Sequence, residues 1–411
     1  MRVLQLSARN IWPLNTGAKL REFYLAREVA RQFPLTYAGF WDDAERPPGG
    51  GACPALEMLP GADDVVMVPK PERYTLVKLL RGLFGPPVTI LNYTTATMTK
   101  TVDRLLASGR FGAVQIEGVH AAGYLPAIAA RGALPVVCDW HNIESELLRR
   151  YSEHAAGLGR RLYAWRTAAV LERYEQRLAA SCQAHIVVSR RDGARVLAWA
   201  PGADVRIVEN GVDTAYFEAT AASLPAARRR ILFVGSMDYH ANIDGAVWFA
   251  REVWPLLRER IPGAVLTIAG RNPAPAVAAL ASQPGVEVTG TVADVRPYYA
   301  EALAAVVPLR IGSGTRLKIP EAMAAGVPVV STRLGAEGLD VTPGSDILLG
   351  DSPVELADAV AAVAMNRELA GSLAEAGLRL ARERYDWSRV ARPLLEIFSG
   401  FGERARAEVA G

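Results

Sequence analysis

Short apolar runs alternate with stretches of helical periodicity along the whole chain. Apolar runs of about four to eight residues bounded by turn residues are typical of buried strands, and apolar residues that recur every three or four positions are typical of helices. Strands that alternate with helices in this way predict βαβ units, and therefore parallel sheets covered by helices. In the first half, the pattern predicts strands at Val3–Ser7, Leu35–Phe40, Val65–Val68, Ala113–Glu117, Pro135–Asp139, Ala184–Ser189 and Val205–Val208. The helices expected between them cover Gly17–Gln32, Glu72–Phe84, Thr97–Ala107, Ala121–Ala130, Glu144–Ala179 and Arg191–Trp199.

The same pattern starts again in the second half of the chain. Strands are expected at Ile231–Gly235, Val265–Ala269, Val286–Thr289, Ala305–Pro308, Val327–Ser331 and Ile347–Leu349, and helices at Ile243–Glu259, Ala274–Ser282, Val295–Leu303, Pro320–Ala325, Pro353–Met365 and Arg367–Arg384. Between the halves, an Asn-Gly turn at Asn210 precedes an Ala- and Arg-rich stretch, Ala219–Arg230, which we interpret as a linker. The economical architecture is therefore α/β, with two doubly wound, Rossmann-like domains that face each other across a cleft and bind ligands at the carboxyl ends of their strands.

Composition narrows this picture. The 411 residues are too many for one compact core and suit two domains of about 200 residues. With 50% hydrophobic and 22% charged residues the chain is globular, and its formal charge of +3 gives no reason to expect a nucleic-acid partner. Cys53, Cys138 and Cys182 are odd in number and widely spaced, so they indicate neither a disulfide framework nor a zinc site and favour a reducing cytosol. The first residues lack the features of a signal peptide, and no apolar run is long enough to span a membrane, so we expect a cytoplasmic protein.

The most informative segment of the chain is Pro308–Val330, which has the pattern of a strand end, a glycine loop, a short helix and a second strand. Glycines allow the backbone amides of Gly312–Thr315 to approach a ligand closely, and amides at the start of a helix attract anions. Arg316 and Lys318 can neutralise phosphate charge, and an ionised Glu321 accepts hydrogen bonds from sugar hydroxyls. Only five of the 46 basic residues are Lys, which makes a lysine in this loop more noteworthy. The segment suits a ligand that carries a diphosphate and a sugar, although the two cations could also be ordinary surface charges.

Two further glycine loops open predicted helices. Gly17 and Lys19 follow the first strand of the chain, and Lys19 is the other lysine placed in such a loop, although a glycine at a turn is a weak signal by itself. The loop Gly235–Asn242 opens the first helix of the second half. Asp238 and Asn242 there suit helix capping, and we expect Asn242 to act as a cap.

Taken together, these motifs resemble the retaining GT-B glycosyltransferases of family 4, also called glycosyl transferases group 1, and they are closest to bacterial exopolysaccharide-type sugar transferases. The resemblance covers essentially the full length. It is strongest over Phe233–Asn242, Ile268–Gly270, Gly290–Val295 and Pro308–Gly338, and weaker at Trp12–Arg21, Asn210–Asp213 and Tyr385–Ser388.

The resemblance implies a GT-B fold with an acceptor-binding domain (1–209), a nucleotide-sugar-binding domain (210–384) and a C-terminal helix that crosses back to the first domain (385–411). It implies that the donor is bound by Gly17, Gly235, Ser236, Gly270, Arg271, Thr291, Val292, Gly312, Ser313, Gly314, Thr315 and Glu321. Arg316 and Lys318 would assist departure of the nucleoside diphosphate. The family places a histidine near the end of a first-domain strand; the aligned residue here is Glu117, and His120 and His141 are alternative contacts to the transferred sugar.

This sequence departs from the family pattern at the phosphate site. Ser313 stands where the family carries a glutamate, and the usual Arg and Lys positions fall near Ser236 and Ala241. Arg316 and Lys318 are then expected to supply the positive charge from a different loop. A degenerate, non-catalytic member of the family is the alternative.

The implied activity is metal-independent transfer of a hexosyl unit from a nucleotide-diphosphate sugar to a hydroxyl of a glycan, lipid-linked or small-molecule acceptor, with retention, in polysaccharide biosynthesis. No D-x-D motif is present, so no metal is expected, and the incomplete dinucleotide fingerprint at Gly312 disfavours a nicotinamide cofactor, so no cofactor is expected either. A nucleotide-sugar epimerase of the same fold and a non-catalytic partner in glycan assembly are the alternatives.

A last feature concerns membranes. Leucines recur at helical spacing among basic residues over Lys70–Phe84. Such a basic amphipathic helix can lie on anionic lipid, which would give peripheral contact with the inner membrane, or it can pack against its own domain.

Overall fold

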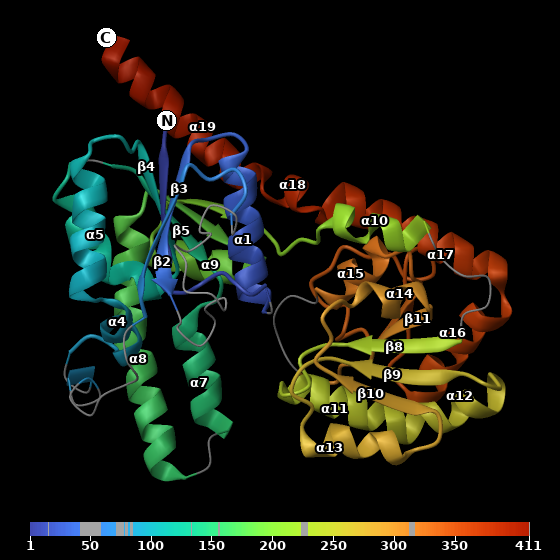
Figure 1. Cartoon of the computed structure of the whole chain (residues 1–411). Coiled ribbons are helices and arrows are strands. Elements are labelled where there is room, and N and C mark those ends of the chain that lie inside the picture. The colour runs from blue at the N-terminus through green and yellow to red at the C-terminus, as the bar shows by residue number, and fades with distance from the viewer. Residues whose placement is uncertain are drawn as a thin grey trace. The chain divides into compact units, whose positions relative to one another are not determined.

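The computed structural model describes residues 1–14, 16–41, 59–70, 78, 81–82, 85–132, 134–154, 157–222, 229–311 and 317–410. They form two compact units: Met1–Glu209 together with Ala391–Gly411 (unit 1), and Asn210–Val390 (unit 2). Each unit contains its own parallel sheet covered by helices, as the alternating pattern predicts (Figure 1).

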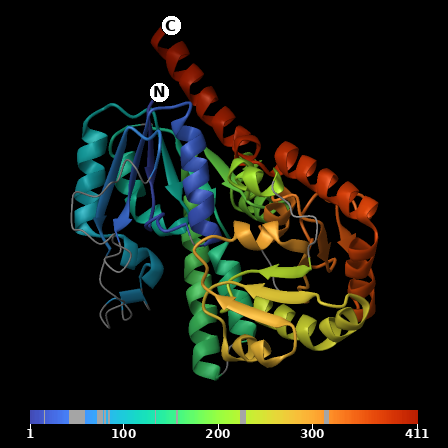
Figure 2. The ribbon, with the colours of Figure 1, turned by 45° about the vertical axis from the view of Figure 1, so that its right-hand side comes forward.

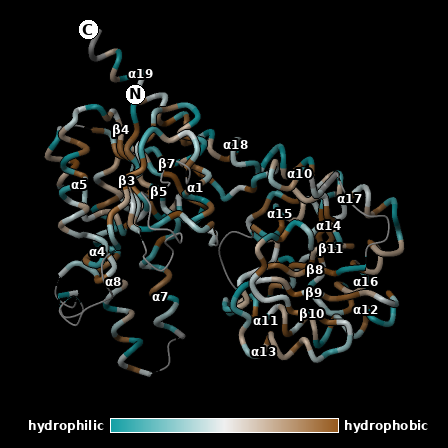
Figure 3. The backbone as a smooth tube through the Cα atoms, viewed as in Figure 1, coloured by the Kyte–Doolittle hydropathy of each residue, from teal (hydrophilic) through white to brown (hydrophobic). Residues whose placement is uncertain are grey.

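Unit 1 is built on seven parallel strands among its described residues, in the order β3-β2-β1-β4-β5-β6-β7. The strands are β1 Val3–Leu6, β2 Leu35–Trp41, β3 Asp64–Pro69, β4 Ala113–Glu117, β5 Val136–Trp140, β6 Ala184–Val187 and β7 Asp204–Ile207. The helices are α1 Gly17–Ala30, α4 Val88–Tyr93, α5 Ala96–Ala107, the 3-10 helix Val119–Tyr124, α6 Leu125–Ala129, α7 Glu144–His154, α8 Leu158–Ser181, α9 Arg190–Trp199 and α19 Arg392–Ala410. Every residue of β1, β4 and β5 is buried, and most of them are apolar, as expected for strands covered on both faces; the polar exceptions are Gln5, Gln115, Glu117 and Asp139. Hydrophobic positions are brown in Figure 3.

Unit 2 is built on six parallel strands among its described residues, in the order β10-β9-β8-β11-β12-β13. The strands are β8 Arg230–Val234, β9 Val265–Ala269, β10 Val286–Gly290, β11 Ala302–Val307, β12 Val329–Ser331 and β13 Leu348–Leu349. The helices are α10 Thr214–Ala222, α11 His240–Trp248, the π-helix Phe249–Val253, α12 Trp254–Arg260, α13 Pro275–Ala278, the 3-10 helix Ala279–Ser282, α14 Arg296–Ala300, α15 Lys318–Ala324, α16 Pro353–Met365, α17 Arg367–Leu380, the π-helix Ala381–Tyr385 and α18 Trp387–Val390. Residues of β8, β9, β11 and β12 form the centre of its core.

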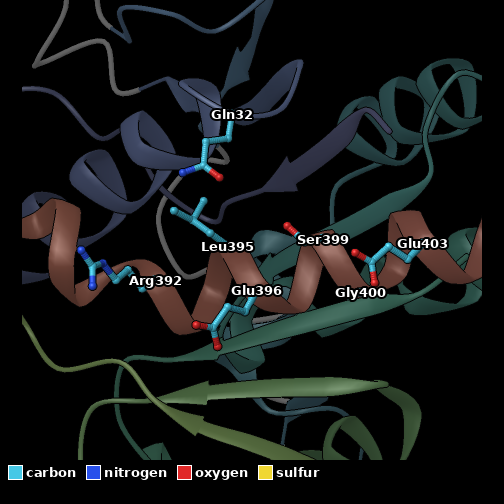
Figure 4. Close-up of a pocket in the computed structure, with 7 residues that line it drawn as sticks. All are labelled: Gln32, Arg392, Leu395, Glu396, Ser399, Gly400 and Glu403. Carbon is cyan, nitrogen blue, oxygen red and sulfur yellow. The ribbon is translucent and has the colours of Figure 1, made fainter.

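The last helix of the chain belongs to unit 1. Phe398 of α19, the red helix that ends at the C-terminus in Figure 2, is fully buried and meets the ring of Phe33 edge-on at 5.9 Å. A shallow pocket lies where α19 passes Gln32, directly after α1, and Figure 4 shows its lining of mostly polar side chains. Its residues are Gln32, Arg392, Leu395, Glu396, Ser399, Gly400 and Glu403.

The structure corrects several expected elements. The single helix expected over Glu144–Ala179 is two helices, because the chain reverses near Gly157, whose φ of 91° suits glycine. The helix α4 has no counterpart in the expected pattern. Ala302 and Leu303, expected to end a helix, begin β11.

The expected linker also needs correction, since α10 covers its first residues. Asp386 Oδ2 accepts hydrogen bonds from the backbone N–H and the hydroxyl of Thr214, and Phe217 is buried in the core of unit 2. These contacts hold the segment as a helix of that unit.

Candidate functional site

The first candidate site lies in unit 1, at the edge where parallel strands end. Glu117 is the last residue of β4 and pairs in register with Asp139 of β5, and His141 directly follows β5. Because adjacent parallel strands end at the same edge of a sheet, these three side chains meet although they are far apart in the sequence. Sequence analysis named Glu117 and His141 as alternatives, and the structure brings them together.

Glu117 and His141 are directly hydrogen-bonded, with Oε2 and Nε2 2.7 Å apart. The other carboxyl oxygen of Glu117, Oε1, accepts hydrogen bonds from the amides of Gln5 and Gln115, each at 2.7 Å. His141 Nδ1 is buried without a hydrogen-bond partner among the described residues. The two amides therefore fix the Glu117 side of the pair, whereas Nδ1 of His141 remains available to a ligand.

Burial sets the protonation of this pair. Burial, reinforced by nearby Asp139, raises the pKa of Glu117 to about 8, and burial lowers the pKa of His141 to about 4. At neutral pH the proton then resides on Glu117, which donates to Nε2 of a neutral imidazole. A neutral imidazole that accepts at Nε2 carries its own proton on Nδ1, so the spare group of His141 is a hydrogen-bond donor.

Helix α1 adds a second carboxylate to this cluster. Glu22 is fully buried; its Oε1 accepts a hydrogen bond from the Tyr37 hydroxyl at 2.6 Å, and its Oε2 lies 3.6 Å from Arg9 Nε. Burial, together with the charge of Glu117, raises the pKa of Glu22 to about 7. At neutral pH a protonated Glu117 and a Glu22 near the midpoint of its titration therefore lie beside one neutral imidazole.

The neighbouring residue of α1 holds the strand ends in place. Arg21 is 1% exposed and forms a bidentate ion pair with Asp139, with N–O distances of 2.8 to 3.1 Å. Its remaining nitrogen donates to the carbonyl oxygens of Val208 and Glu209 at 2.6 and 3.1 Å. A buried guanidinium whose donors are satisfied in this way rigidly fixes α1 against β5.

The other sequence candidates of unit 1 lie around this cluster. His120 packs edge-on against Tyr93 with ring centroids 5.7 Å apart, and burial, with Arg9, lowers the pKa of His120 to about 4. Gly17 is the first residue of α1, whose N-cap is Thr16. The ammonium of Lys19 donates to the carbonyl oxygen of Trp12 at 3.2 Å.

Glu22, Glu117 and His141 also have the composition of a metal site, since each offers one ligand atom within 4.8 Å of the others. The hydrogen bond between Glu117 and His141 already joins two of these ligand atoms, whereas Glu22 Oε2, 3.6 Å from Arg9 Nε, has no hydrogen-bond partner among the described residues.

The second candidate site lies at the carboxyl ends of β8 and β9 in unit 2. A Cβ atom at Gly270 would lie 1.6 Å from the carbonyl oxygen of Gly235, so only glycine allows these two loops to approach each other. The Gly235 N–H donates to Ala269 O at 3.0 Å, and the Gly270 N–H donates to Gly290 O at 3.2 Å. The expected glycine loops therefore form one layer of closely packed backbone.

A chain of polar contacts crosses this layer. Arg271 Nε donates to the Ser236 hydroxyl at 2.8 Å, and the Asn242 side-chain amide donates to the Ser236 carbonyl oxygen at 2.9 Å. Lys318, at the start of α15, donates to Asn242 Oδ1 at 2.6 Å and lies 4.9 Å from the centre of the Phe233 ring. Arg271, which follows β9, and Lys318, the first residue of α15, are thus both placed near Ser236.

The expected capping role of Asn242 is wrong. Tyr239 occupies the N-cap position of α11 and makes no side-chain capping bond. Asn242 lies three residues further on, and its amide instead joins the Ser236 loop to Lys318.

Glu321 lies one turn after Lys318 on α15. Burial raises the pKa of Glu321 to about 7, and the charge of Lys318 lowers it in part. After β10, the side chain of Thr291 is exposed and that of Val292 is partly buried. Gly312, Ser313, Gly314, Thr315 and Arg316 lie outside the described residues, as does most of the basic helix expected over Lys70–Phe84.

Sequence reasoning missed the contributions of Glu22, Arg9, Gln5 and Gln115. A signal was present, because Arg21-Glu22 interrupts a buried apolar helix face at Phe23, Leu25 and Ala26. Charged residues are rarely buried unless they are paired, so such an interruption indicates a buried polar network.

Comparison with known proteins agrees with this architecture. Residues 228–366 match the family Glycosyl transferases group 1, and residues 65–216 match Glycosyltransferase Family 4. An uncharacterized 44.6 kDa protein in the cps region of Klebsiella pneumoniae is 25% identical over 168 residues, which are 39% of this chain and 43% of that protein. The match therefore spans less than half of that relative.

Solved structures share the fold over almost the whole chain. A sucrose-phosphate synthase from Thermosynechococcus elongatus has a TM-score of 0.67 at 16% identity, covering 98% of this chain and 100% of its own. HepE from Anabaena, in complex with UDP, has a TM-score of 0.64 at 15% identity, covering 97% and 100%. WaaG, a glycosyltransferase involved in lipopolysaccharide biosynthesis, has a TM-score of 0.62 at 14% identity, covering 97% and 100%. Because group 1 and family 4 domains match the two units and the fold is that of these structures, the chain belongs to the GT-B glycosyltransferases.

Proposed function

We propose that this glycosyltransferase moves a hexosyl unit from a nucleotide-diphosphate sugar to a hydroxyl of a glycan, lipid-linked or small-molecule acceptor, with retention and without a metal ion. The observation that carries the proposal is the polar layer of unit 2, where Arg271, Ser236, Asn242 and Lys318 meet at the carboxyl ends of β8 and β9. This is the edge at which doubly wound sheets bind nucleotides. A nucleotide-sugar donor is supported by the UDP bound to HepE, and a glycan acceptor is supported by the role of WaaG in lipopolysaccharide biosynthesis.

Unit 2 would bind the donor. Arg271 and Lys318 supply positive charge. Asn242 holds the Lys318 ammonium beside the Gly235-Ser236 backbone, and the absence of a side chain at Gly270 allows its own loop to pack against that backbone. A diphosphate would draw both cations to itself, since charge-assisted hydrogen bonds to phosphate are stronger than those to a neutral amide. Glu321 would accept hydrogen bonds from sugar hydroxyls. Arg316 and the amides of Gly312–Thr315 are proposed to complete this site.

Unit 1 would contact the transferred sugar and the acceptor. The Nδ1–H of His141 lacks a partner among the described residues, and a sugar hydroxyl would satisfy it. Glu117 fixes the tautomer and orientation of the ring through Nε2. His120, neutral at physiological pH, is a second candidate for a hydroxyl contact.

Charge stabilisation at the leaving group would then carry most of the catalysis. Since Glu117, with its pKa raised to about 8, holds a proton at neutral pH, it is not available as a base there. In the mechanism that the family resemblance suggests, the departing phosphate accepts the proton of the acceptor hydroxyl on the same face of the sugar. The product then keeps the anomeric configuration of the donor.

The test is incubation with labelled UDP-, GDP- and dTDP-sugars and a panel of acceptors in the presence of a metal chelator. The proposal expects transfer that needs both substrates, with an unchanged anomeric configuration by NMR. Arg316→Ala should reduce turnover by ~10²–10³ at saturating donor, the usual effect of removing one preorganised charge donor. A loss of less than about threefold would refute the role of Arg316.

Two alternatives have distinct outcomes in the same assay. Conversion of the sugar nucleotide without any acceptor would indicate an epimerase. Donor binding without turnover on any acceptor would indicate a non-catalytic partner in glycan assembly. The proposed site of action is the cytoplasm; among the described helices, none is both long and apolar enough to cross a bilayer.

A further inference from the structure

The hairpin of α7 and α8 extends beyond the core of unit 1. Helix α8 has 24 residues, which corresponds to about 36 Å. Its buried positions begin only at Ala164, so its first turns make no contribution to the core. In Figure 1 the two green helices reach well past the ends of the strands of their unit.

Large apolar side chains are exposed on this end of the hairpin. Twelve large hydrophobic residues of the described chain are exposed, and five of them fall between positions 151 and 165. Their exposed fractions are 55% for Tyr151, 84% for Leu158, 66% for Leu162, 44% for Tyr163 and 60% for Trp165. Single exposed apolar residues are ordinary, but a cluster of this kind marks an interaction site.

The exposed residues form a stripe that is separate from the packing face of α8. Leu158, Leu162 and Trp165 follow i, i+4, i+7 spacing and therefore share one face of the helix. At about 100° per residue, this face is rotated by roughly 100° from the line through the buried Ala164 and Ala168. The stripe is consequently not the surface that packs on unit 1.

Positive charge surrounds the stripe. Arg161 lies on one flank and Arg166 on the other by helical rotation, and both are exposed. Glu153 is the one acidic residue among the described positions 151–153 and 157–166, which we call the hairpin tip. An apolar stripe with Trp and Tyr, flanked by Arg, is the composition of helices that lie in a lipid interface.

We propose that the hairpin tip docks on an anionic lipid bilayer, with Leu158, Leu162 and Trp165 among the headgroups and Arg161 and Arg166 on their phosphates. Lipid is favoured over a second copy of this chain because a symmetric pairing of the tip would place Arg against Arg. An anionic surface instead attracts each nearby Arg with about 1 kcal/mol. This surface is distinct from the basic helix expected over Lys70–Phe84.

The test is co-sedimentation of the full chain with vesicles of phosphatidylcholine alone or mixed with phosphatidylglycerol, without donor or acceptor. Wild type should sediment only with the anionic vesicles. Arg161→Gln with Arg166→Gln should weaken binding by about tenfold or more, since each Arg contributes about fivefold. Leu162→Glu with Trp165→Glu should weaken it by at least about tenfold.

The matched control is Met365→Glu, which removes an apolar side chain that is 69% exposed at the end of α16 in unit 2. It should bind like wild type, and far-UV circular dichroism should confirm that every variant is folded. The proposal is overturned if wild type stays in the supernatant, or if the Leu162/Trp165 variant binds as well as wild type does. It is equally overturned if wild type is a dimer in solution that this variant converts to a monomer, because the tip is then a self-association surface.

Membrane docking would bring unit 1 to lipid-linked acceptors, an extension that rests on the proposed function. The two ideas fail separately, because vesicle binding is measured without substrates and transfer is measured without vesicles.

Discussion

Glu117→Gln tests whether the buried pair in unit 1 is a carboxylic acid beside a neutral imidazole. A glutamine at this position is isosteric with a protonated glutamate. Its amide can donate to His141 Nε2, and its carbonyl oxygen can accept from Gln5 and Gln115, as the carboxyl group does now. The substitution should therefore preserve the structure while removing one titration.

The sign of the pH effect follows from the raised pKa of Glu117. From its ordinary value of 4.5 up to about 8, native Glu117 holds a proton that the unfolded chain has released. The native state then binds more protons than the unfolded state, so stability falls as the pH rises through this window. Below pH 6.5, buried histidines such as His120 and His141, whose pKa values are lowered to about 4, act in the opposite direction. Between pH 6.5 and 8 these histidines no longer oppose the effect of Glu117, so the test uses this pH range.

Across that window the titration of Glu117 should reduce the free energy of unfolding by roughly 1.5 kcal/mol. The Gln variant should lack this part of the decline. Relative to wild type, its free energy of unfolding should therefore rise by the same amount between pH 6.5 and 8. Glu22, with a pKa of about 7, contributes a similar decline to both proteins. Hydrogen exchange in urea, followed on peptides from β4 and β5, reports unit 1 alone. A wild type and a variant with equal pH dependence would show that Glu117 is ionised, and the neutral-pair account would be wrong.

Three further substitutions probe the two sites. Lys318→Ala should lower turnover at saturating donor by ~10²–10³, because it removes one preorganised cation from the leaving group; steady-state kinetics measures this, and near-normal turnover would exclude the role. Gly270→Ala should destabilise unit 2 by about 1–3 kcal/mol, because the new methyl group would lie 1.6 Å from the Gly235 carbonyl oxygen; urea denaturation that matches wild type would contradict this packing. Arg21→Ala should destabilise unit 1 by about 3–5 kcal/mol, since it leaves the buried carboxylate of Asp139 unpaired; hydrogen exchange on β5 peptides measures the loss, and unchanged protection would refute it.

The sequence predicted the features that depend on local pattern. The apolar runs correctly indicated the buried strands, and the glycine loops after β8 and β9 were expected where they occur. Glu117 and His141 were named from the family resemblance, as alternatives for one contact to the transferred sugar. The contact between them could not be derived, because it depends on side-chain directions at the ends of β4 and β5.

Features that depend on distant contacts were missed. Asn242 was expected to cap α11 because its residue type suits that role, but its amide is drawn instead to Ser236 and Lys318. The end of α10, from Ala219 on, was taken for the start of a linker because it is rich in Ala and follows an Asn-Gly turn, and the contact of this helix with Asp386 comes from a segment far along the chain. Glu22 went unnoticed because a charged residue on a helix usually faces solvent.

Calorimetric titration of the full chain with nucleotide-diphosphate sugars, in a buffer containing a chelator, tests the central claim most directly. One donor should bind to wild type, and the affinity should fall sharply in Lys318→Ala but stay unchanged in Met365→Glu. A chain that binds no donor, or binds one equally well without the ammonium of Lys318, would contradict the account.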